Sequence, residues 1–129
     1  MEKLERTILL SGKVVHGQQL GRRLGFPTAN LEVPSSRTEI PETGVYAAQA
    51  HLSDGSVYRA MVNIGFRPTV DASRHTLSIE AHLIGFRGEL YGQPLRLELT
   101  GKIREERKMN SLEDLRAQLE LDLQEVRKW

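Results

Sequence analysis

The sequence predicts a mainly β fold, a small closed or nearly closed antiparallel barrel with one helix packed against it. Two observations support this prediction. Most of the chain consists of short stretches rich in β-branched or alternating apolar residues, and turn signals separate these stretches. Near the C-terminus the apolar period changes from two residues to three and four, which is typical of an amphipathic helix. We therefore expect several short strands followed by one C-terminal helix.

The N-terminal third contains one expected strand and two expected connections. Residues 7–16 are rich in β-branched side chains and form the strand. Residues 17–30 contain three glycines spaced four apart and follow neither a helical nor a strand period, so we expect a shaped loop. Residues 31–44 contain Pro34 and Pro41, which favour a further connection rather than a strand.

The central part of the chain predicts a β-hairpin. Residues 45–52 and 57–64 are two β-rich runs that flank the Asp54-Gly55 pair. An Asp-Gly pair between two such runs is a strong hairpin signal, because both residues tolerate a positive φ.

Two further strands are predicted by strict alternation, over residues 77–84 and 95–100. In the first of them, four apolar residues share one face and three polar residues share the other: Leu77, Ile79, Ala81 and Leu83 against Ser78, Glu80 and His82. In the second, three leucines alternate with polar residues: Leu95, Leu97 and Leu99 against Arg96, Glu98 and Thr100.

The expected helix covers about residues 112–127. Its apolar residues recur at three- and four-residue steps and form one stripe: Leu112, Leu115, Leu119, Leu123 and Val126. Ser111 with Asp114 three residues later resembles a capping box, with Asp in place of the usual Glu or Gln.

Composition excludes several classes of function. The 129 residues fit one domain, and 18 Lys plus Arg against 17 Asp plus Glu give a net charge of +1, without the basic excess typical of nucleic-acid binding. The absence of cysteine excludes disulfides, thiolate catalysis and Cys-based metal sites. The apolar run at residues 8–10 is too short for a signal peptide or a membrane span. We therefore expect a cytoplasmic domain that binds neither nucleic acid nor membrane.

The glycine-rich loop is the first candidate site. Gly17, Gly21 and Gly25 would allow several backbone N–H groups to turn toward one anion, as in phosphate-binding loops, and Arg22 would add positive charge. The loop matches neither a Walker A motif nor a dinucleotide-binding fingerprint. On spacing alone, anion binding and a purely structural glycine loop remain open.

The segment Pro27-Thr28-Ala29-Asn30 is the second candidate site. Thr28 and Asn30 are two residues apart, so in an extended segment they project to the same side. Their hydroxyl and amide oxygens are hard ligands that suit Mg²⁺. The alternative is that both residues cap a turn, and the residues by themselves favour that alternative.

Glu80 is the third candidate. Alternation places it on the polar face of its strand, which in a barrel faces either solvent or the mouth of a site. The pattern alone favours a solvated carboxylate, and His82 on the same face has the same interpretation. The charged run at residues 102–108 mixes both signs and is typical of a solvated strand end.

Taken together, these segments resemble the riboflavin kinase family. The resemblance spans roughly residues 11–124, and the motif of Pro27 to Asn30 is its most specific part. It rests on five blocks in a fixed order: SGKVVHGQQLGRRLGFPTANL at 11–31, PETGVY at 41–46, NIGFRPTV at 63–70, LSIEAHLIGFRGELYG at 77–92 and KIREERKMNSLEDLRAQLELD at 102–122.

This resemblance implies a six-stranded antiparallel Greek-key barrel with a C-terminal helix, and transfer of the ATP γ-phosphate to the 5′-hydroxyl of riboflavin to give FMN and ADP. It implies that ATP phosphates bind the glycine loop, that Mg²⁺ or another divalent ion binds Thr28 and Asn30, and that Glu80 is the general base. The weaker candidates for the flavin and nucleotide sites are Phe26, Arg104 and Glu106. The chain departs from the family's usual pattern at Gly85 and Met109, neither of which is a proposed catalytic group.

The resemblance also bears on domains and partners. In bacteria this kinase module is often the C-terminal half of a bifunctional FAD synthetase, and nothing in residues 1–129 resembles the adenylyltransferase half. We therefore expect one kinase domain, either a stand-alone enzyme or an excised half, with FMN as product. Two alternatives are a non-catalytic flavin or nucleotide sensor and a nucleic-acid-binding barrel, and the charge balance argues against the latter.

Overall fold

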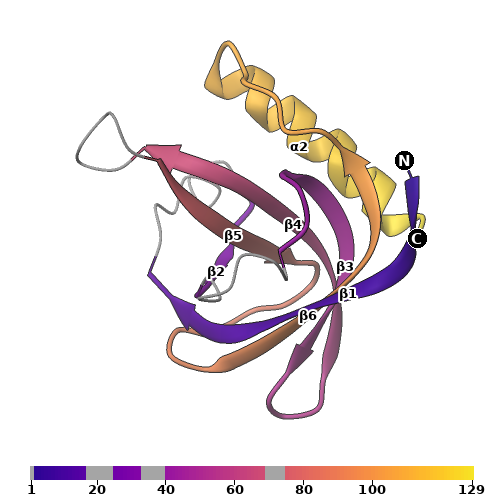
Figure 1. Cartoon of the computed structure of the whole chain (residues 1–129). Helices are drawn as coiled ribbons and strands as arrows, with labels where there is room; N and C mark the ends of the chain where they lie inside the picture. The colour runs from indigo at the N-terminus through magenta and orange to yellow at the C-terminus, as the bar shows by residue number, and fades with distance from the viewer. Residues whose placement is uncertain (1, 17–24, 33–39, 69–74) are drawn as a thin grey trace.

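The computed structural model of the chain describes residues 2–16, 25–32, 40–68 and 75–129. Within these residues it contains six strands and a helix: β1 (Glu2–Val15), β2 (Ala29–Leu31), β3 (Gly44–Leu52), β4 (Val57–Pro68), β5 (His75–Leu83), β6 (Pro94–Arg104) and α2 (Leu112–Arg127). Figure 1 shows the strands curled into a barrel, with α2 lying along the outside of the wall.

The strands form a closed antiparallel barrel in the order β1-β2-β5-β4-β3-β6. Strands β3, β4 and β5 are neighbours in sequence and in space, whereas β2 precedes β3 in the chain but lies beside β5. This return of a fourth strand to the far side of a three-strand meander is a Greek key. The fold therefore confirms the expected six-stranded barrel, and it places β5 between β2 and β4.

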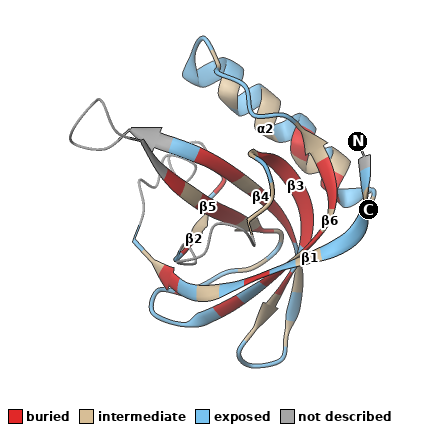
Figure 2. Ribbon diagram, in the orientation of Figure 1, coloured by how far each residue is buried: buried red, intermediate tan, exposed pale blue. Residues whose placement is uncertain are grey.

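Every second residue along the strands points inward, and these side chains fill the interior of the barrel. The four apolar residues predicted to share one face of β5 are all buried, and so are Leu95, Leu97 and Leu99 of β6. Figure 2 shows this alternation of buried and less buried positions along the strands. Small residues complete the narrow interior beside these larger ones, as is usual in small barrels: Ala48, Ala50, Ala60 and Ala81.

The predicted hairpin is confirmed, and its second strand is longer than expected. The amide of Leu52 donates to the Ser56 carbonyl at 2.9 Å, which closes the turn between β3 and β4. Gly55 has a φ of +89°, the left-handed conformation that its Asp-Gly context predicts. The Asp54 carboxylate accepts hydrogen bonds from the Ser56 hydroxyl at 2.5 Å and from the Ser56 amide at 2.8 Å, and these two interactions, the hydroxyl bond first, lower the pKa of Asp54.

The predicted helix is also confirmed. The Ser111 hydroxyl accepts a hydrogen bond from the Asp114 amide at 3.1 Å, which makes Ser111 the N-cap. The apolar face of α2 covers a second cluster on the outside of the barrel, formed by Phe26, Val45, Ala47, Met61 and Val126, with Leu119 and Leu123 packed against it. Leu112 was expected in this apolar stripe, but it is 54% exposed because it lies in the first turn, outside that cluster.

The largest differences from the sequence prediction lie near the N-terminus. Strand β1 begins at Glu2 rather than residue 7, because its first residues pair with Lys102 and Gly101 of β6. Residues 29–31 were expected in connections but form β2, which pairs with β1 on one side and β5 on the other. Three residues are too few to show an alternation, so the strand arises from its two partners rather than from its own pattern.

Lys102 corrects the expectation that residues 102–108 form a solvated strand end. Strand β6 continues to Arg104, and Lys102 is only 8% exposed. Its ammonium group lies 2.5 Å from a Glu42 carboxylate oxygen and 2.7 Å from one of Glu105. Burial of the ammonium opposes its charge, but hydrogen bonds to Glu105 and Glu42 outweigh burial and raise the pKa of Lys102. The charge is thus buried with two partners.

Candidate active site

Glu80 lies at the centre of a polar group on the outer face of the barrel. In the strand register it is directly opposite Asn30 of β2 and directly opposite Asn63 of β4. Cross-strand neighbours in such pairs have Cβ atoms about 4.5–5.5 Å apart. The side chain of Glu80 was expected to be solvated, but the residue is only 7% exposed. Its low exposure between two amide-bearing positions makes Glu80 a candidate for chemistry.

Three buried oxygen atoms around Glu80 have no hydrogen-bond partner within the described part of the chain: Thr28 Oγ1, Asn63 Oδ1 and Ser78 Oγ. Ser78 lies two residues before Glu80 on the same face of β5, and Thr28 lies two residues before Asn30. A buried polar atom without a partner costs about 1–3 kcal/mol. Three of them on one face make this surface a candidate for binding polar groups of a ligand.

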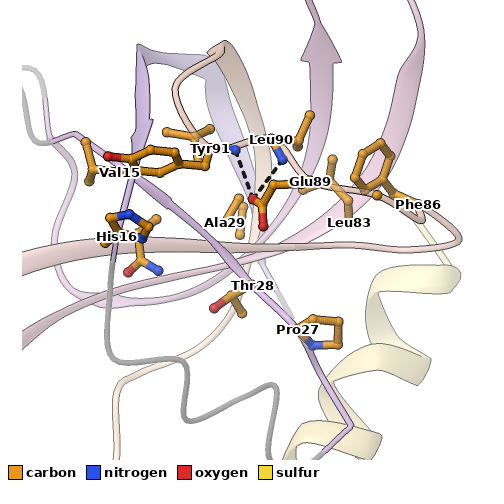
Figure 3. A pocket seen from close by; sticks show the side chains of 14 residues that line it. Val15, His16, Pro27, Thr28, Ala29, Leu83, Phe86, Glu89, Leu90 and Tyr91 are labelled. Atoms are coloured by element: carbon orange, nitrogen blue, oxygen red, sulfur yellow. Dashed lines mark hydrogen bonds between the residues drawn. The ribbon is translucent and has the colours of Figure 1, made fainter.

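A cavity of about 130 Å³ adjoins this polar group, at the end of the barrel where β1, β2 and β5 meet. Both Thr28 and Asn30 line it, together with apolar residues of β1 and β5 and the segment 86–91. Figure 3 shows Thr28 among these lining residues, beside Ala29 and Pro27. Thr28 and Asn30 therefore border a space that a ligand can enter.

Aromatic rings and one carboxylate shape the wall of this cavity opposite β2. His16 stacks on Tyr91, with ring centroids 3.8 Å apart and an interplanar angle of 22°. The Glu89 carboxylate accepts hydrogen bonds from the amides of Leu90 and Tyr91 at 3.0 and 2.9 Å, which Figure 3 draws as dashed lines. These bonds hold the loop that carries Tyr91, so the stacked rings form an ordered wall.

The structure brings some of the predicted site residues together. Thr28, Asn30 and Glu80 share one face, as the sequence predicted for the first two and as the strand register now shows for the third. Gly25 has a φ of +90°, which favours glycine there. The remaining predicted phosphate-binding residues, Gly17, Gly21 and Arg22, lie outside the described residues.

The three weaker candidates for the flavin and nucleotide sites, Phe26, Arg104 and Glu106, all make contacts within the fold. Phe26 is 7% exposed and packs in the cluster beneath α2. The Arg104 guanidinium donates to both carboxylate oxygens of Asp122 at 2.9–3.1 Å, which ties the end of β6 to α2. The Glu106 carboxylate lies directly against Gly65 of β4, in the space that a Cβ at position 65 would occupy. Glu106 therefore lies over β4, the strand that also carries Asn63 of the polar group.

Asn63 and Ser78 were missed by sequence reasoning, although both stand in expected strands. Asn63 is a polar exception between Met61 and Gly65 on the outer face of β4, which also carries Arg59. That exception was the available signal, but its meaning depends on the partner strand. Only the register of β4 with β5 shows that Asn63 is opposite Glu80.

No helix in the described ranges is long and apolar enough to cross a membrane. Those ranges also contain no group of three or more His, Cys, Asp or Glu residues arranged to hold a metal ion.

A closed barrel that places a carboxylate of low exposure beside hydroxyl and amide oxygens, next to a cavity, has the kinds of groups that a group-transfer site requires. The sequence profile of the riboflavin kinase family, Flavokinase, matches residues 4–129. The chain therefore belongs to the riboflavin kinase family.

Individual relatives agree with this assignment. The chain is 41% identical over 124 residues to the bifunctional riboflavin kinase/FMN adenylyltransferase of Bacillus subtilis, a match that covers 95% of this chain and 39% of the relative. It spans 35–39% of the length of the first four curated relatives it matches.

Two solved structures share the fold. The riboflavin kinase of Trypanosoma brucei aligns with a TM-score of 0.68 at 25% identity, over 99% of this chain and 81% of that one. A Streptococcus pneumoniae chain described as a macrolide-efflux protein aligns with a TM-score of 0.82 at 34% identity, over 94% of this chain and 38% of that one.

Proposed function

We propose that this chain transfers the γ-phosphate of ATP to the 5′-hydroxyl of riboflavin, giving FMN and ADP. The observation that supports this most strongly is the placement of Glu80, buried between Asn30 and Asn63. The family assignment supports the substrate class, and the strand register, which places Glu80 opposite Asn30 and Asn63, supports the assignment of Glu80 as the base. The bifunctional relatives are named for two activities, and we propose that this chain performs the kinase reaction of that pair.

Glu80 orients the acceptor hydroxyl and takes its proton. The hydroxyl oxygen forms a bond to the γ-phosphorus, while the bond from that phosphorus to the β–γ bridging oxygen breaks and ADP leaves with the electron pair. Phosphoryl transfer requires mainly positioning and charge neutralisation, with no covalent enzyme intermediate. A positioned general base contributes roughly 10²–10⁴-fold in rate.

A divalent cation fits the residues present. Thr28 Oγ1 is buried without a partner in the described part of the chain, and Asn30 lines the same cavity. A hydroxyl and an amide oxygen match the preference of Mg²⁺, which takes one or two protein ligands together with substrate phosphates and water. When bound, Mg²⁺ neutralises the charge that develops on the transferring phosphoryl group. Thr28 and Asn30 would hold it, and the chain's own task is to present both oxygens on one side.

The two substrates approach the polar group from different sides. Thr28 and Asn30 line the cavity, whereas Glu80 is not among its described lining residues. We therefore place the nucleotide in the cavity, with its phosphates at Thr28 and Asn30. The flavin then lies on the outer face of β4 and β5, where Glu80, Asn63 and Ser78 point. The 5′-hydroxyl of riboflavin then meets the γ-phosphate between the cavity and this outer face.

The test of the proposed function is product analysis. The protein is incubated with riboflavin and MgATP, and FMN is resolved from riboflavin by chromatography. We expect FMN and ADP in equal amounts. If both substrates bind in calorimetry but no FMN forms, the chain is a flavin or nucleotide sensor instead.

A further inference from the structure

His82 contacts the segment that presents the proposed metal ligands. It lies two residues after Glu80 on β5, and its Nδ1 is 2.7 Å from the carbonyl oxygen of Pro27. Its ring also meets Phe26 edge-on, with centroids 5.6 Å apart and an interplanar angle of 65°. One imidazole thus touches the two residues that come directly before Thr28.

We propose that His82 is a positioning residue that holds Thr28 in place for the metal-bound nucleotide. The identity of that ligand rests on the proposed function, but the contacts do not. The strand pairing between β2 and β5 begins at Ala29. Proline has no N–H, so this ladder cannot be extended through a donor at Pro27. The Pro27 carbonyl remains as an acceptor, and His82 donates to it.

Thr28 is therefore held between two attachments to the same strand. On its C-terminal side, Asn30 is paired with Glu80. On its N-terminal side, the Pro27 carbonyl is bonded to His82. The Thr28 hydroxyl has no hydrogen-bond partner among the described residues that would orient it. Its position consequently depends on the backbone at residues 27 to 29, which β5 fixes from both sides.

The contact with the Pro27 carbonyl also determines which ring nitrogen of His82 donates a hydrogen bond. A carbonyl oxygen can only accept, so Nδ1 must carry the proton that forms this bond. Groups that hold metal ligands in place typically change metal affinity 10–100-fold when they are removed. The proposal therefore predicts a loss in metal–nucleotide affinity rather than in the chemical step.

Asparagine and glutamine separate the two ring nitrogens. The amide nitrogen of Asn can take the place of Nδ1, whereas that of Gln reaches toward the position of Nε2. We expect His82→Asn to remain close to the wild type. His82→Gln and His82→Phe should weaken MgADP binding and raise the half-saturating Mg²⁺ concentration about tenfold or more. The kcat at saturating MgATP and the riboflavin affinity should change less than about threefold, because the proposed role of the ring is to hold residues 26 and 27 rather than to contact a reacting group.

The variants are measured by calorimetry with MgADP and by kinetics, so one readout is independent of activity. His82→Phe keeps a ring against Phe26, which separates loss of the donor from loss of packing. His51→Gln is the matched control, because His51 lies on β3 beside Glu98 of β6.

Equal losses in His82→Asn and His82→Gln would overturn the proposal, as would a fall in kcat with unchanged MgADP affinity. Wild-type protein that binds MgADP but makes no FMN would refute the proposed function instead, and the binding comparison would still test His82.

Discussion

At the residue scale, the unpartnered oxygens define the site more sharply than charge does. A hydroxyl such as that of Thr28, buried without a partner in the described ranges, lowers the stability of the free protein. Its retention is explained if a ligand supplies the missing interaction. Stability and function should therefore respond in opposite directions when such an oxygen is removed.

Thr28→Val tests this directly. Valine has nearly the shape of threonine, so the substitution removes only the unpartnered hydroxyl. We expect the free energy of unfolding to stay the same or to rise by up to about 1–3 kcal/mol. Binding of MgADP should weaken about tenfold, because a proposed metal ligand is lost. Denaturant unfolding and calorimetry measure the two effects, and a destabilised variant with normal MgADP affinity would contradict this role.

Asn63 makes a complementary prediction on the flavin side. Asn63→Ala removes a buried amide oxygen that has no partner among the described residues, on the side of Glu80 away from Asn30. We expect the KM for riboflavin to rise roughly 5–30-fold, equivalent to one hydrogen bond of about 1–2 kcal/mol. The KM for MgATP should stay the same. A change confined to MgATP would place Asn63 on the nucleotide side instead.

Sequence reasoning was most successful at this scale for side-chain direction. Alternation correctly assigned Leu77 and Ile79 to the interior and Glu80 to the opposite face. It did not predict that Glu80 is buried, because burial on the outer face depends on what other segments cover. It also gave His82 no role, since the Pro27 carbonyl that it contacts is 55 residues away in sequence.

At the element scale, residues on either side of α2 make close contacts with glycines of the barrel. The Trp129 ring occupies the space where a Cβ at Gly101 of β6 would lie, and the Glu106 side chain does the same at Gly65 of β4. The two sites differ in what must move, a rigid ring in one and the end of a flexible side chain in the other.

Gly101→Ala and Gly65→Ala therefore form a matched pair. We expect Gly101→Ala to destabilise the fold by about 1–3 kcal/mol, typical of overpacking, because the indole cannot move without shifting the end of the chain. Gly65→Ala should cost less, since Glu106 can swing away. Trp129 is the chain's single tryptophan, so its fluorescence reports unfolding in both variants. Equal losses would show that the tryptophan contact is not a constraint.

The buried ion pair between Arg104 and Asp122 gives a second prediction at this scale. Asp122 is 1% exposed and also accepts a hydrogen bond from Gln118 at 2.9 Å. Arg104→Ala leaves this carboxylate without its charged partner, which typically costs about 3–5 kcal/mol. Asp122→Asn keeps an acceptor for Arg104 and should cost less. Urea unfolding compares them, and a loss below about 1 kcal/mol in Arg104→Ala would contradict a structural role for the pair.

Elements were predicted where they are long and periodic, and missed where pairing alone creates them. The helix over 112–127 and the hairpin around Asp54-Gly55 have strong local signals, and both are confirmed. Strand β2 has only three residues after a proline, and no local pattern identifies it. Its existence, and with it the approach of Asn30 to Glu80, follows from the closure of the barrel.

At the scale of the whole molecule, the balanced charge agrees with a site that is local rather than spread over a basic surface. The net charge is +1, yet the proposed ligand is a polyanion. The positive field that ATP requires must then come from a bound cation and from directed N–H groups, both of which act at short range. The site therefore depends on the position of a few oxygens on β2, β4 and β5.

The measurement that tests this account most directly compares FMN formation by the wild type and by Glu80→Gln, with MgATP binding measured in parallel. Glu98→Gln on β6 is the matched control. We predict that the wild type makes FMN, and that kcat falls roughly 10²–10⁴-fold in Glu80→Gln while MgATP affinity stays within about threefold. An undiminished kcat in Glu80→Gln would contradict the account, as would a wild type that makes no FMN.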